Sequence, residues 1–402
     1  NIIFMECVKK MVKQFGHKKV TMVAGVGDQI FFNASKKQAK LQQKKNYSFV
    51  NANEETIFHN SLYLTPKFSK ISDQIFKKIK TKNFFVQKHF YHKYINQMAY
   101  NYRGPKVITE FINIFKYFKV EHYMPFLDKK FQELVLSLKK NELHNGKTKK
   151  TFINNSNKII NPSHKVIPGL KIITPQREIL YENRKKILKV INTSILVKQK
   201  IIDKKKILEN FNNYLVEFVK FKKNKKVLNK FNSYDIWKFL TSEIFLRAHA
   251  SKEKKILNKK INYRLLGFYL KYGLISLPNS KTIYNKKKIL SWEKSKYKTN
   301  LNTSSKTCFE YLKKKIDNFV LKQKKDKLKI CLMLSSGRDS RLVYNLLESS
   351  VKKYRYSKSF FSFTAEYDGF KDYSEYEEIK KTWKKKIFNH EVVKIESNNI
   401  FD

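Results

Sequence analysis

Residues 331–347, Cys-Leu-Met-Leu-Ser-Ser-Gly-Arg-Asp-Ser-Arg-Leu-Val-Tyr-Asn-Leu-Leu, run from a short apolar stretch through a Ser/Gly turn into an amphipathic segment. This pattern predicts a strand, a tight turn and the start of a helix. The first N–H groups of a helix have no partner within the helix, and its macrodipole is positive there, so such a turn is suited to bind phosphate. Small side chains at Ser335, Ser336 and Gly337 let phosphate oxygens approach the main chain closely.

Asp339 lies within the same loop. A carboxylate beside a polyphosphate is repelled unless it holds a Mg²⁺ that bridges the two groups, so we expect Asp339 to be a metal ligand rather than only a helix cap. The loop lacks the Lys-Ser/Thr ending of a Walker A loop. The sequence therefore indicates another kind of phosphate-binding loop.

A second apolar stretch, residues 20–24, ends in the turn Gly25-Val26-Gly27-Asp28. Near the C-terminus, residues 360–365 and 391–395 are typical of strands, and residues 373–387 between them are typical of a helix. This alternation predicts a doubly wound parallel sheet, in which ligands bind at the carboxyl ends of the strands. Both Gly/Ser-rich turns are expected at that edge.

Helical periodicity dominates residues 41–250, so the expected fold class is α/β with a large helical complement. Asp128 is expected to cap a helix, and a polar break is expected at residues 141–158. Further helices are expected from Thr174-Pro175 to Ile191 and from Ser233 to Leu246, the latter with Ile236, Leu240 and Ile244 or Phe245 facing inward.

The chain of 402 residues holds 86 Lys and Arg against 33 Asp and Glu, a net charge of +53. Lysine is spread through every segment together with Asn, Ile, Phe and Tyr, which is the bias of an A/T-rich genome, so nucleic acid is not expected as the main partner. The three cysteines show no disulfide or zinc spacing, and no apolar run reaches membrane-spanning length. We expect a cytoplasmic protein with no membrane partner, and a chain that begins at Asn1 as a fragment or processed piece.

Residues 335–340, Ser-Ser-Gly-Arg-Asp-Ser, resemble the S-G-G-x-D-S loop of ATP pyrophosphatases. Four other segments strengthen the resemblance and narrow it to the synthetase domain of the glutamine-hydrolysing asparagine synthase family. Residues 25–31 are similar to its G-x-G-G-D-E-x-F turn, residues 124–128 to its R-x-P-F-L-D segment, residues 236–246 to its tryptophan helix, and residues 361–364 to the strand beside adenine. Residues 266–284 resemble the stretch that joins its two domains, whereas residues 41–100 and 186–232 have no specific counterpart.

The resemblance implies an adenine nucleotide alpha-hydrolase-like sheet that binds ATP and Mg²⁺. It implies that a small-molecule carboxylate becomes an acyl-adenylate with release of pyrophosphate, and that ammonia or an amine then displaces AMP. The implied phosphate-binding residues are Ser335, Ser336, Gly337, Ser340 and Gly27, the implied metal ligands are Asp339 and Asp28, and the implied catalytic lysine is Lys165 or Lys171. The backbones of Leu332 and Phe363 are implied to lie beside adenine.

Two departures from the family pattern bear on activity. Gln29 replaces the glutamate of the family turn and Val26 interrupts its glycines, which weakens the implied metal site. The glutaminase nucleophile of the family has no counterpart here, and Cys7 is expected to be a packing residue, so we expect ammonia or an amine donor to come from outside this chain or from an N-terminal region absent from it. The alternatives are a tRNA-modifying ATP pyrophosphatase and a degenerate, non-catalytic copy with a structural or nucleic-acid-binding role.

The motifs also occur in inverted order, because the pyrophosphate loop follows the Gly/Asp turn here. We expect residues 1–250 to be the later part of one synthetase domain, residues 251–260 a linker, and residues 261–402 the beginning of another such domain. A window across two tandem copies is preferred over a circular permutation or a join made in gene prediction. The tandem-copy hypothesis predicts two incomplete sheets, which could dock within the chain or in a homo-oligomer. A permutation predicts that the strand ending at Ala24 lies beside the strand ending at Leu334.

Overall fold

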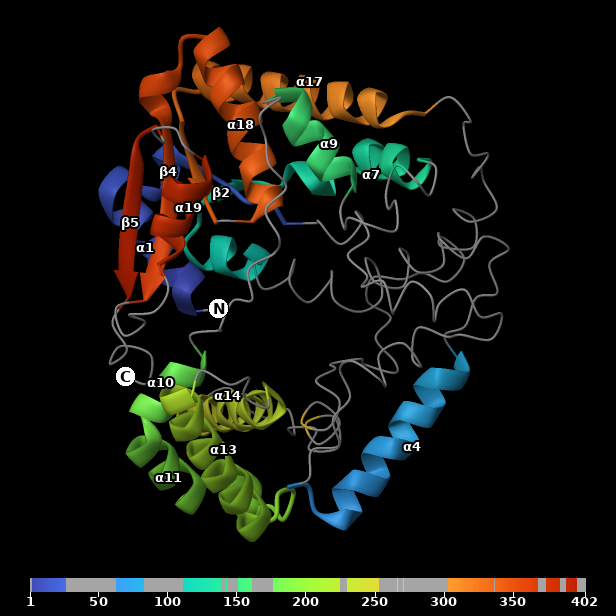
Figure 1. Ribbon diagram of the computed structural model, residues 1–402, viewed down its shortest axis with the longest axis vertical. Helices are drawn as coiled ribbons and strands as arrows, with labels where there is room; N and C mark the ends of the chain where they lie inside the picture. Colours follow the sequence, from blue (N-terminus) through green and yellow to red (C-terminus); the bar gives the residue numbers. More distant parts are fainter. Residues whose placement is uncertain are drawn as a thin grey trace. The chain divides into compact units, whose positions relative to one another are not determined.

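The computed structural model describes residues 2–26, 63–82, 111–138, 142, 151–160, 176–224, 230–252, 266, 270, 303–335, 337–367, 374–383 and 388–395 (Figure 1). The chain divides into two compact units. Unit 1 comprises residues 1–45, 86–171 and 286–402, and unit 2 comprises residues 46–85 and 172–285. The expected linker at residues 251–260 lies almost entirely outside the described residues, so that boundary stays a prediction.

Unit 1 is built on a five-stranded sheet in which every strand pair is parallel. Its strands are β1 (Val20–Val23), β2 (Glu121–Tyr123), β3 (Lys329–Met333), β4 (Phe360–Tyr367) and β5 (His390–Ile395), in the spatial order β2-β1-β3-β4-β5. The α/β class and the parallel sheet are confirmed. The expectation of two separate, incomplete sheets was wrong, because Val20 of β1 pairs with Lys329 of β3 in one continuous sheet.

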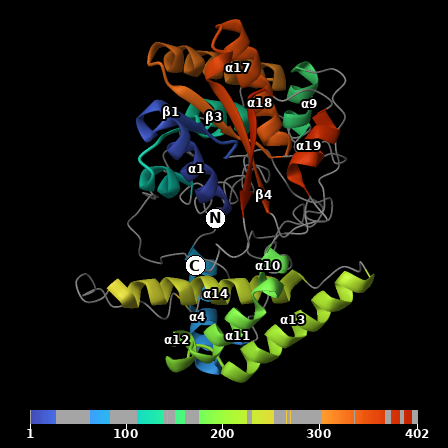
Figure 2. The same cartoon turned by 90° about the vertical axis from the view of Figure 1, so that its left-hand side faces the viewer.

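Helices cover both faces of this sheet. One face carries α17 (Ser305–Lys325), α18 (Arg338–Lys353) and α19 (Glu375–Trp383), whose apolar side chains form one core with Val23 and Leu332. The other face carries α1 (Ile2–Phe15), where Phe15 packs on Phe361 with ring centroids 4.6 Å apart. Figure 2 shows α1 and α18 on opposite sides of β3 and β4. Short 3-10 helices, η1 (His17–Lys19) and η5 (Ser357–Ser359), precede β1 and β4.

The segment after β2 is fixed to α17 by Asp128. The 3-10 helix η4 (Pro125–Leu127) leads to α7 (Lys129–Leu136), and Asp128 caps α7 by accepting a hydrogen bond from the Phe131 amide, as predicted. Tyr311 and Lys315 of α17 bind the same carboxylate at 2.9 and 3.0 Å. Burial alone would raise the pKa of Asp128, but these hydrogen bonds outweigh it and lower the pKa.

The expected polar break at residues 141–158 was wrong in its last part, since α9 (Thr151–Ile160) is a helix. Phe152 and Ile153 join the core beneath α17 and α18, and Asn154 and Asn157 are buried beside α18. The sequence of α9 is rich in Asn and has a low intrinsic helix propensity, so tertiary packing stabilises this helix.

The described part of unit 2 is helical apart from one antiparallel bridge, Leu64 to Ile202. Its helices are α4 (Pro66–Lys82), α10 (Gln176–Glu182), α11 (Arg184–Asn192), α12 (Ile195–Lys198), α13 (Lys204–Asn224) and α14 (Lys230–Lys252). The helix expected to run to Ile191 is interrupted at Asn183. Ser233 was wrongly predicted as a helix start, since it lies within α14. Ile236 and Leu240 are buried as expected, but Ile244 is 48% exposed.

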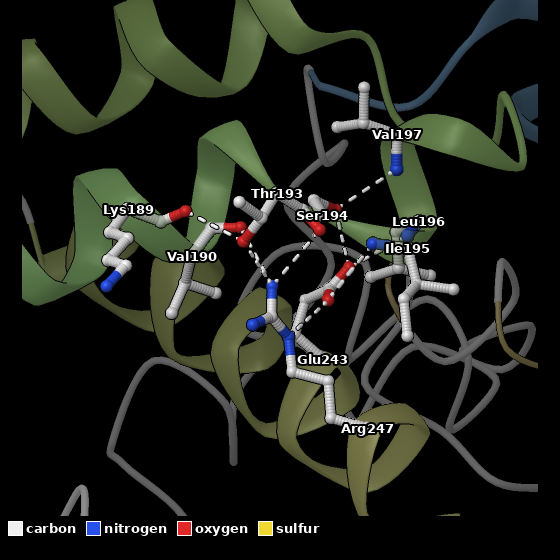
Figure 3. Close-up of polar contacts among 9 residues, drawn as sticks. All are labelled: Lys189, Val190, Thr193, Ser194, Ile195, Leu196, Val197, Glu243 and Arg247. Atoms are coloured by element: carbon white, nitrogen blue, oxygen red, sulfur yellow. Dashed lines mark hydrogen bonds and ion pairs between the residues drawn. The ribbon is translucent and has the colours of Figure 1, made fainter. Parts of the chain in front are cut away.

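A buried carboxylate joins three helices of unit 2 (Figure 3). Glu243 of α14 is buried and accepts hydrogen bonds from the Ser194 hydroxyl and from the amides of Ile195 and Leu196 at the start of α12. Arg247 pairs with Glu243 at 3.3 Å and donates to the carbonyl oxygens of α11 at Val190 and beyond it at Thr193. Glu243 therefore holds the three helices together, and we call its contacts with Ser194, Ile195, Leu196 and Arg247 the Glu243 clasp.

None of the helices among the described residues is both long and apolar enough to cross a membrane.

Candidate functional site

The strand order places a topological switch point between β1 and β3. From β3 the chain moves outward to β4 and then β5, whereas from β1 it moves outward in the opposite direction to β2. In doubly wound sheets, ligands bind at the switch point, outside the carboxyl ends of the two central strands. Here those ends lead into the turns at Gly25 and Ser335, the two turns that the sequence singled out.

The loop after β3 is fixed at its start by β4. The Leu334 amide donates to the Phe363 carbonyl at 2.8 Å, and the buried Thr364 hydroxyl donates to the Leu334 carbonyl at 3.0 Å. These two bonds continue the strand ladder by one residue beyond β3. The direction in which the chain leaves the sheet is therefore fixed before the loop begins.

Two serine hydroxyls close the loop. Ser340 Oγ lies 2.9 Å from Ser335 Oγ and also 2.9 and 3.0 Å from the carbonyl oxygens of Ser335 and Gly337. The Gly337 amide donates to Ser335 Oγ at 3.3 Å. These contacts fold the loop back onto the first turn of α18 and gather hydroxyl and amide donors at the amino end of a 16-residue helix.

Two glycines keep this helix start uncovered. A Cβ atom at Gly337, the N-cap of α18, would lie 3.1 Å from Ser335 Oγ. A Cβ atom at Gly25 would lie 3.4 Å from the Ser340 amide nitrogen and 3.5 Å from the Asp339 carbonyl carbon. The turn after β1 therefore touches the first turn of α18, and a side chain at either glycine would occupy space beside the amides.

The charged residues of the first turn of α18 are partly or fully buried. The sequence left open whether Arg338 and Arg341 contact phosphate or are solvated, but Arg341 is only 6% exposed and is therefore not solvated, and burial lowers its pKa to about 10. Burial also lowers the pKa of Arg338, and the neighbouring Asp339 opposes that shift. This turn thus combines one carboxylate and two desolvated guanidinium groups with the helix amides.

Helix α9 supports the same turn from the side. The side-chain Nδ2 of Asn157 donates to the Arg338 carbonyl at 3.3 Å, and the Arg338 guanidinium donates to Asn154 Oδ1 at 3.4 Å. Asn345, about two helical turns beyond Arg338 on α18, donates to Asn157 Oδ1. Sequence reasoning missed α9, because asparagines in a polar stretch are typical of loops.

Several predicted site residues lie outside the described residues, namely Gly27, Asp28, Ser336, Lys165 and Lys171. Their roles stay predictions. Leu332 and Phe363 are completely buried, so their side chains belong to the core, and any contact with adenine would involve their backbones. Within the described ranges no group of three His, Cys, Asp or Glu side chains forms a metal site.

The described site contains no cysteine. Cys7 is fully buried on α1, and burial raises its pKa to about 12, so its thiol stays protonated at neutral pH, in keeping with the predicted packing role. Cys308 and Cys331 are also buried and free.

Comparisons of the chain with protein-family models, with curated proteins and with solved structures found no match.

Proposed function

We propose that unit 1 binds ATP at the carboxyl ends of β1 and β3 and transfers its adenylyl group to a small-molecule carboxylate, as asparagine synthases do. The observation that supports this proposal most is the pairing of β1 with β3. The two halves of the family resemblance occur in inverted order along the chain, yet their turns meet where Gly25 touches Ser340.

In the proposed reaction, a carboxylate oxygen of the substrate attacks the α-phosphorus of ATP. The bond from this phosphorus to the bridging oxygen breaks, and pyrophosphate leaves with the electron pair. The α18 amides and the hydroxyls of Ser335 and Ser340 would hold the pyrophosphate oxygens, and Gly25 and Gly337 leave room for them. Asp339 would hold Mg²⁺, which when bound neutralises charge that develops on the leaving pyrophosphate.

The proposed second step needs a nitrogen donor. Ammonia or an amine attacks the acyl carbon, the acyl–phosphate bond breaks, and AMP leaves as the amide forms. Cys7 is buried and protonated, so the proposal assigns the donor to free ammonia, an amine or another protein. Lys165 or Lys171 stays the proposed stabiliser of the adenylation step.

Exchange of radiolabelled pyrophosphate into ATP tests the first step, with the full chain and a panel of amino acids and other small carboxylates. We expect exchange that depends on one carboxylate and on Mg²⁺, and we expect Asp339→Asn to lower it by about a hundredfold or more. Asp317→Asn is the matched control, because Asp317 pairs with Lys353 near the opposite end of α18. Wild-type protein that supports no exchange with any carboxylate, or equal exchange in Asp339→Asn, would contradict the proposal.

A further inference from the structure

The parallel sheet of unit 1 has a second edge, at the amino ends of its strands, and this edge is basic. In the chain, Lys19 comes directly before β1, Lys119 precedes β2 by two residues, Lys327 precedes β3 by two, and Lys358 precedes β4 by two. Because the strands are parallel neighbours about 5 Å apart, the turns before them lie side by side. Lys18 and Arg355 lie in two of these same turns. We call these six residues the basic edge.

The cations of the basic edge are available to a ligand. All six side chains are exposed. Within the described part of the chain, none of them forms an ion pair, whereas the nearby Lys352 and Lys353 are paired with Glu348 and Asp317. Two exposed acids, Glu121 and Asp326, lie at the same edge, so cations are in clear excess there. At the opposite edge, the described turn residues 24–26 and 334–335 are uncharged, and the adjoining first turn of α18 carries one carboxylate and two guanidinium groups.

Local backbone preference does not explain three of these cations. Lys119, Lys327 and Arg355 have φ of 54°, 54° and 53°, the left-handed conformation that ends a helix and that favours glycine. A cation near a helix carboxyl end gains some energy from the macrodipole, but a side chain in this conformation costs a similar amount. Glycine at these three positions would therefore stabilise the fold as well as the charged residues do.

An exposed aromatic ring lies beside the array. Tyr117 is 75% exposed, although its neighbour Phe118 packs against it edge-on, and it lies two residues before Lys119. Single-stranded nucleic acids are bound by a row of cations that follows the phosphates together with aromatic side chains on which bases stack. Anionic lipid headgroups also attract basic clusters, but stable binding to a lipid surface needs a second signal, such as an apolar face or a lipid anchor that inserts.

We propose that the basic edge binds the phosphodiester backbone of single-stranded nucleic acid, with Tyr117 as a stacking surface for one base. This proposal is independent of the adenylation chemistry, since the edge lies at the opposite ends of the strands. It also revises the expectation drawn from composition. Lysine is spread evenly along the sequence, but the parallel topology gathers one turn from each of four strands at a single edge.

The test measures binding of a fluorescein-labelled oligouridine of about 20 nucleotides to the full chain by anisotropy, over a series of salt concentrations. The informative variant is Lys119→Gly/Lys327→Gly/Arg355→Gly, because glycine removes the charge and favours the left-handed backbone that these residues adopt. We expect at least a tenfold loss of affinity and a salt slope reduced by about 2, from roughly 0.7 per lost contact. Tyr117→Ala should weaken binding severalfold without changing the salt slope.

The matched control is Lys306→Gln/Lys313→Gln/Lys314→Gln, which removes three exposed charges from the other half of α17. It should change affinity less than threefold. Equal losses in the two triple variants would show diffuse attraction by net charge and would overturn the proposal. Undiminished binding in the glycine variant would also overturn it, as would binding to phosphatidylserine vesicles without binding to the oligonucleotide. Should the glycine variant fail to fold, Lys19→Gln/Lys358→Gln replaces it, with a loss of affinity larger than that of the control and a salt slope reduced by about 1.4 for two lost contacts.

Discussion

At the scale of single residues, His390 is held neutral by its surroundings. The ring nitrogen Nδ1 lies 2.8 Å from the hydroxyl of the buried Ser362, and the ring stacks on Tyr376 with centroids 5.1 Å apart. Burial lowers the pKa of His390 to about 4, and the neighbouring Glu391 only partly opposes that shift. Glu391 is itself engaged by Lys10 and Gln14 of α1.

This lowered pKa predicts that unit 1 loses stability in mild acid. The ordinary pKa of histidine is near 6.5, so between pH 6.5 and 4 the unfolded chain binds a proton that the folded chain does not. The stabilisation is complete above pH 6.5 and is lost as the pH falls towards 4. From about pH 7.5 to pH 5 the contribution of His390 falls by about 2 kcal/mol.

Urea unfolding of wild type and His390→Phe at the two pH values measures this contribution. The variant should lose about 2 kcal/mol less than wild type over the same pH change. His17→Gln, a change at an exposed histidine, should keep the wild-type difference. Parallel pH profiles for wild type and His390→Phe would show that His390 is not the titrating group.

Residue roles that depend on nearby sequence were predictable, and roles set by tertiary neighbours were not. Asp128 was predicted as a helix cap because a cap acts on the amide three residues later. Nothing in the sequence near Arg341 or His390 indicates their burial, which comes from other segments of the chain. Gly25 was noticed as a turn residue, but its contact with Ser340 joins positions at opposite ends of the sequence.

At the scale of elements, the Glu243 clasp holds α11, α12 and α14 together. Glu243→Gln keeps the size of the side chain but removes the charge that accepts two amide hydrogen bonds and pairs with Arg247. Hydrogen bonds to buried charged groups contribute about 1.5–3 kcal/mol each to stability. We expect Glu243→Gln to lower the free energy of unfolding by about 3 kcal/mol, measured by urea denaturation.

Arg247→Met should lower the free energy of unfolding by only about 1 kcal/mol, less than Glu243→Gln does, because the Arg247 side chain is 40% exposed. Glu209→Gln, at an exposed position of α13, is the control and should cost less than about 0.5 kcal/mol. An equal, small effect of Glu243→Gln and Glu209→Gln would contradict the role assigned to the clasp.

Elements with strong periodicity were predicted and elements stabilised by packing were missed. The predicted elements were β1, β3, β4, β5 and the start of α18. Each of these strands coincides with an apolar stretch of the sequence, and turn residues mark the start of α18. By contrast, β2 has only three residues, Glu121–Tyr123, and is held by its pairing with β1. The lysine-rich α17 was not predicted, although Phe309, Leu312 and Ile316 form one face of the core.

At the scale of the whole molecule, the first strands of the sequence complete a sheet begun by the last ones. If β3, β4, β5, β1 and β2 are renumbered 1 to 5, the spatial order of the strands from the β5 edge is 3-2-1-4-5. This is the strand order of a doubly wound sheet. Helix α1 contacts β1, β3, β4 and β5, which is the place of a crossover between β5 and β1. The sequence indicated which edge of the sheet holds the two turns. The sequence did not predict the pairing of β1 with β3, because partner choice between parallel strands depends on contacts across the whole chain.

This assembly predicts that a chemical cross-linker can join α1, near the start of the sequence, to β5, near its end. Lys10 Nζ of α1 lies 3.5 Å from Glu391 Oε2 of β5, and Gln14, separated from Glu391 by 377 positions, donates to Oε1 at 2.7 Å. A zero-length carbodiimide reagent joins an amine to a carboxylate only when the two touch, so it should form an amide between Lys10 and Glu391. The linked peptides should be found by mass spectrometry in the monomer fraction after gel filtration. Lys10→Arg keeps the positive charge but lacks the amine, and should abolish this link alone. If the link occurred only between chains of a dimer, β5 would meet the α1 of a second copy, and a sheet completed within one chain would be wrong.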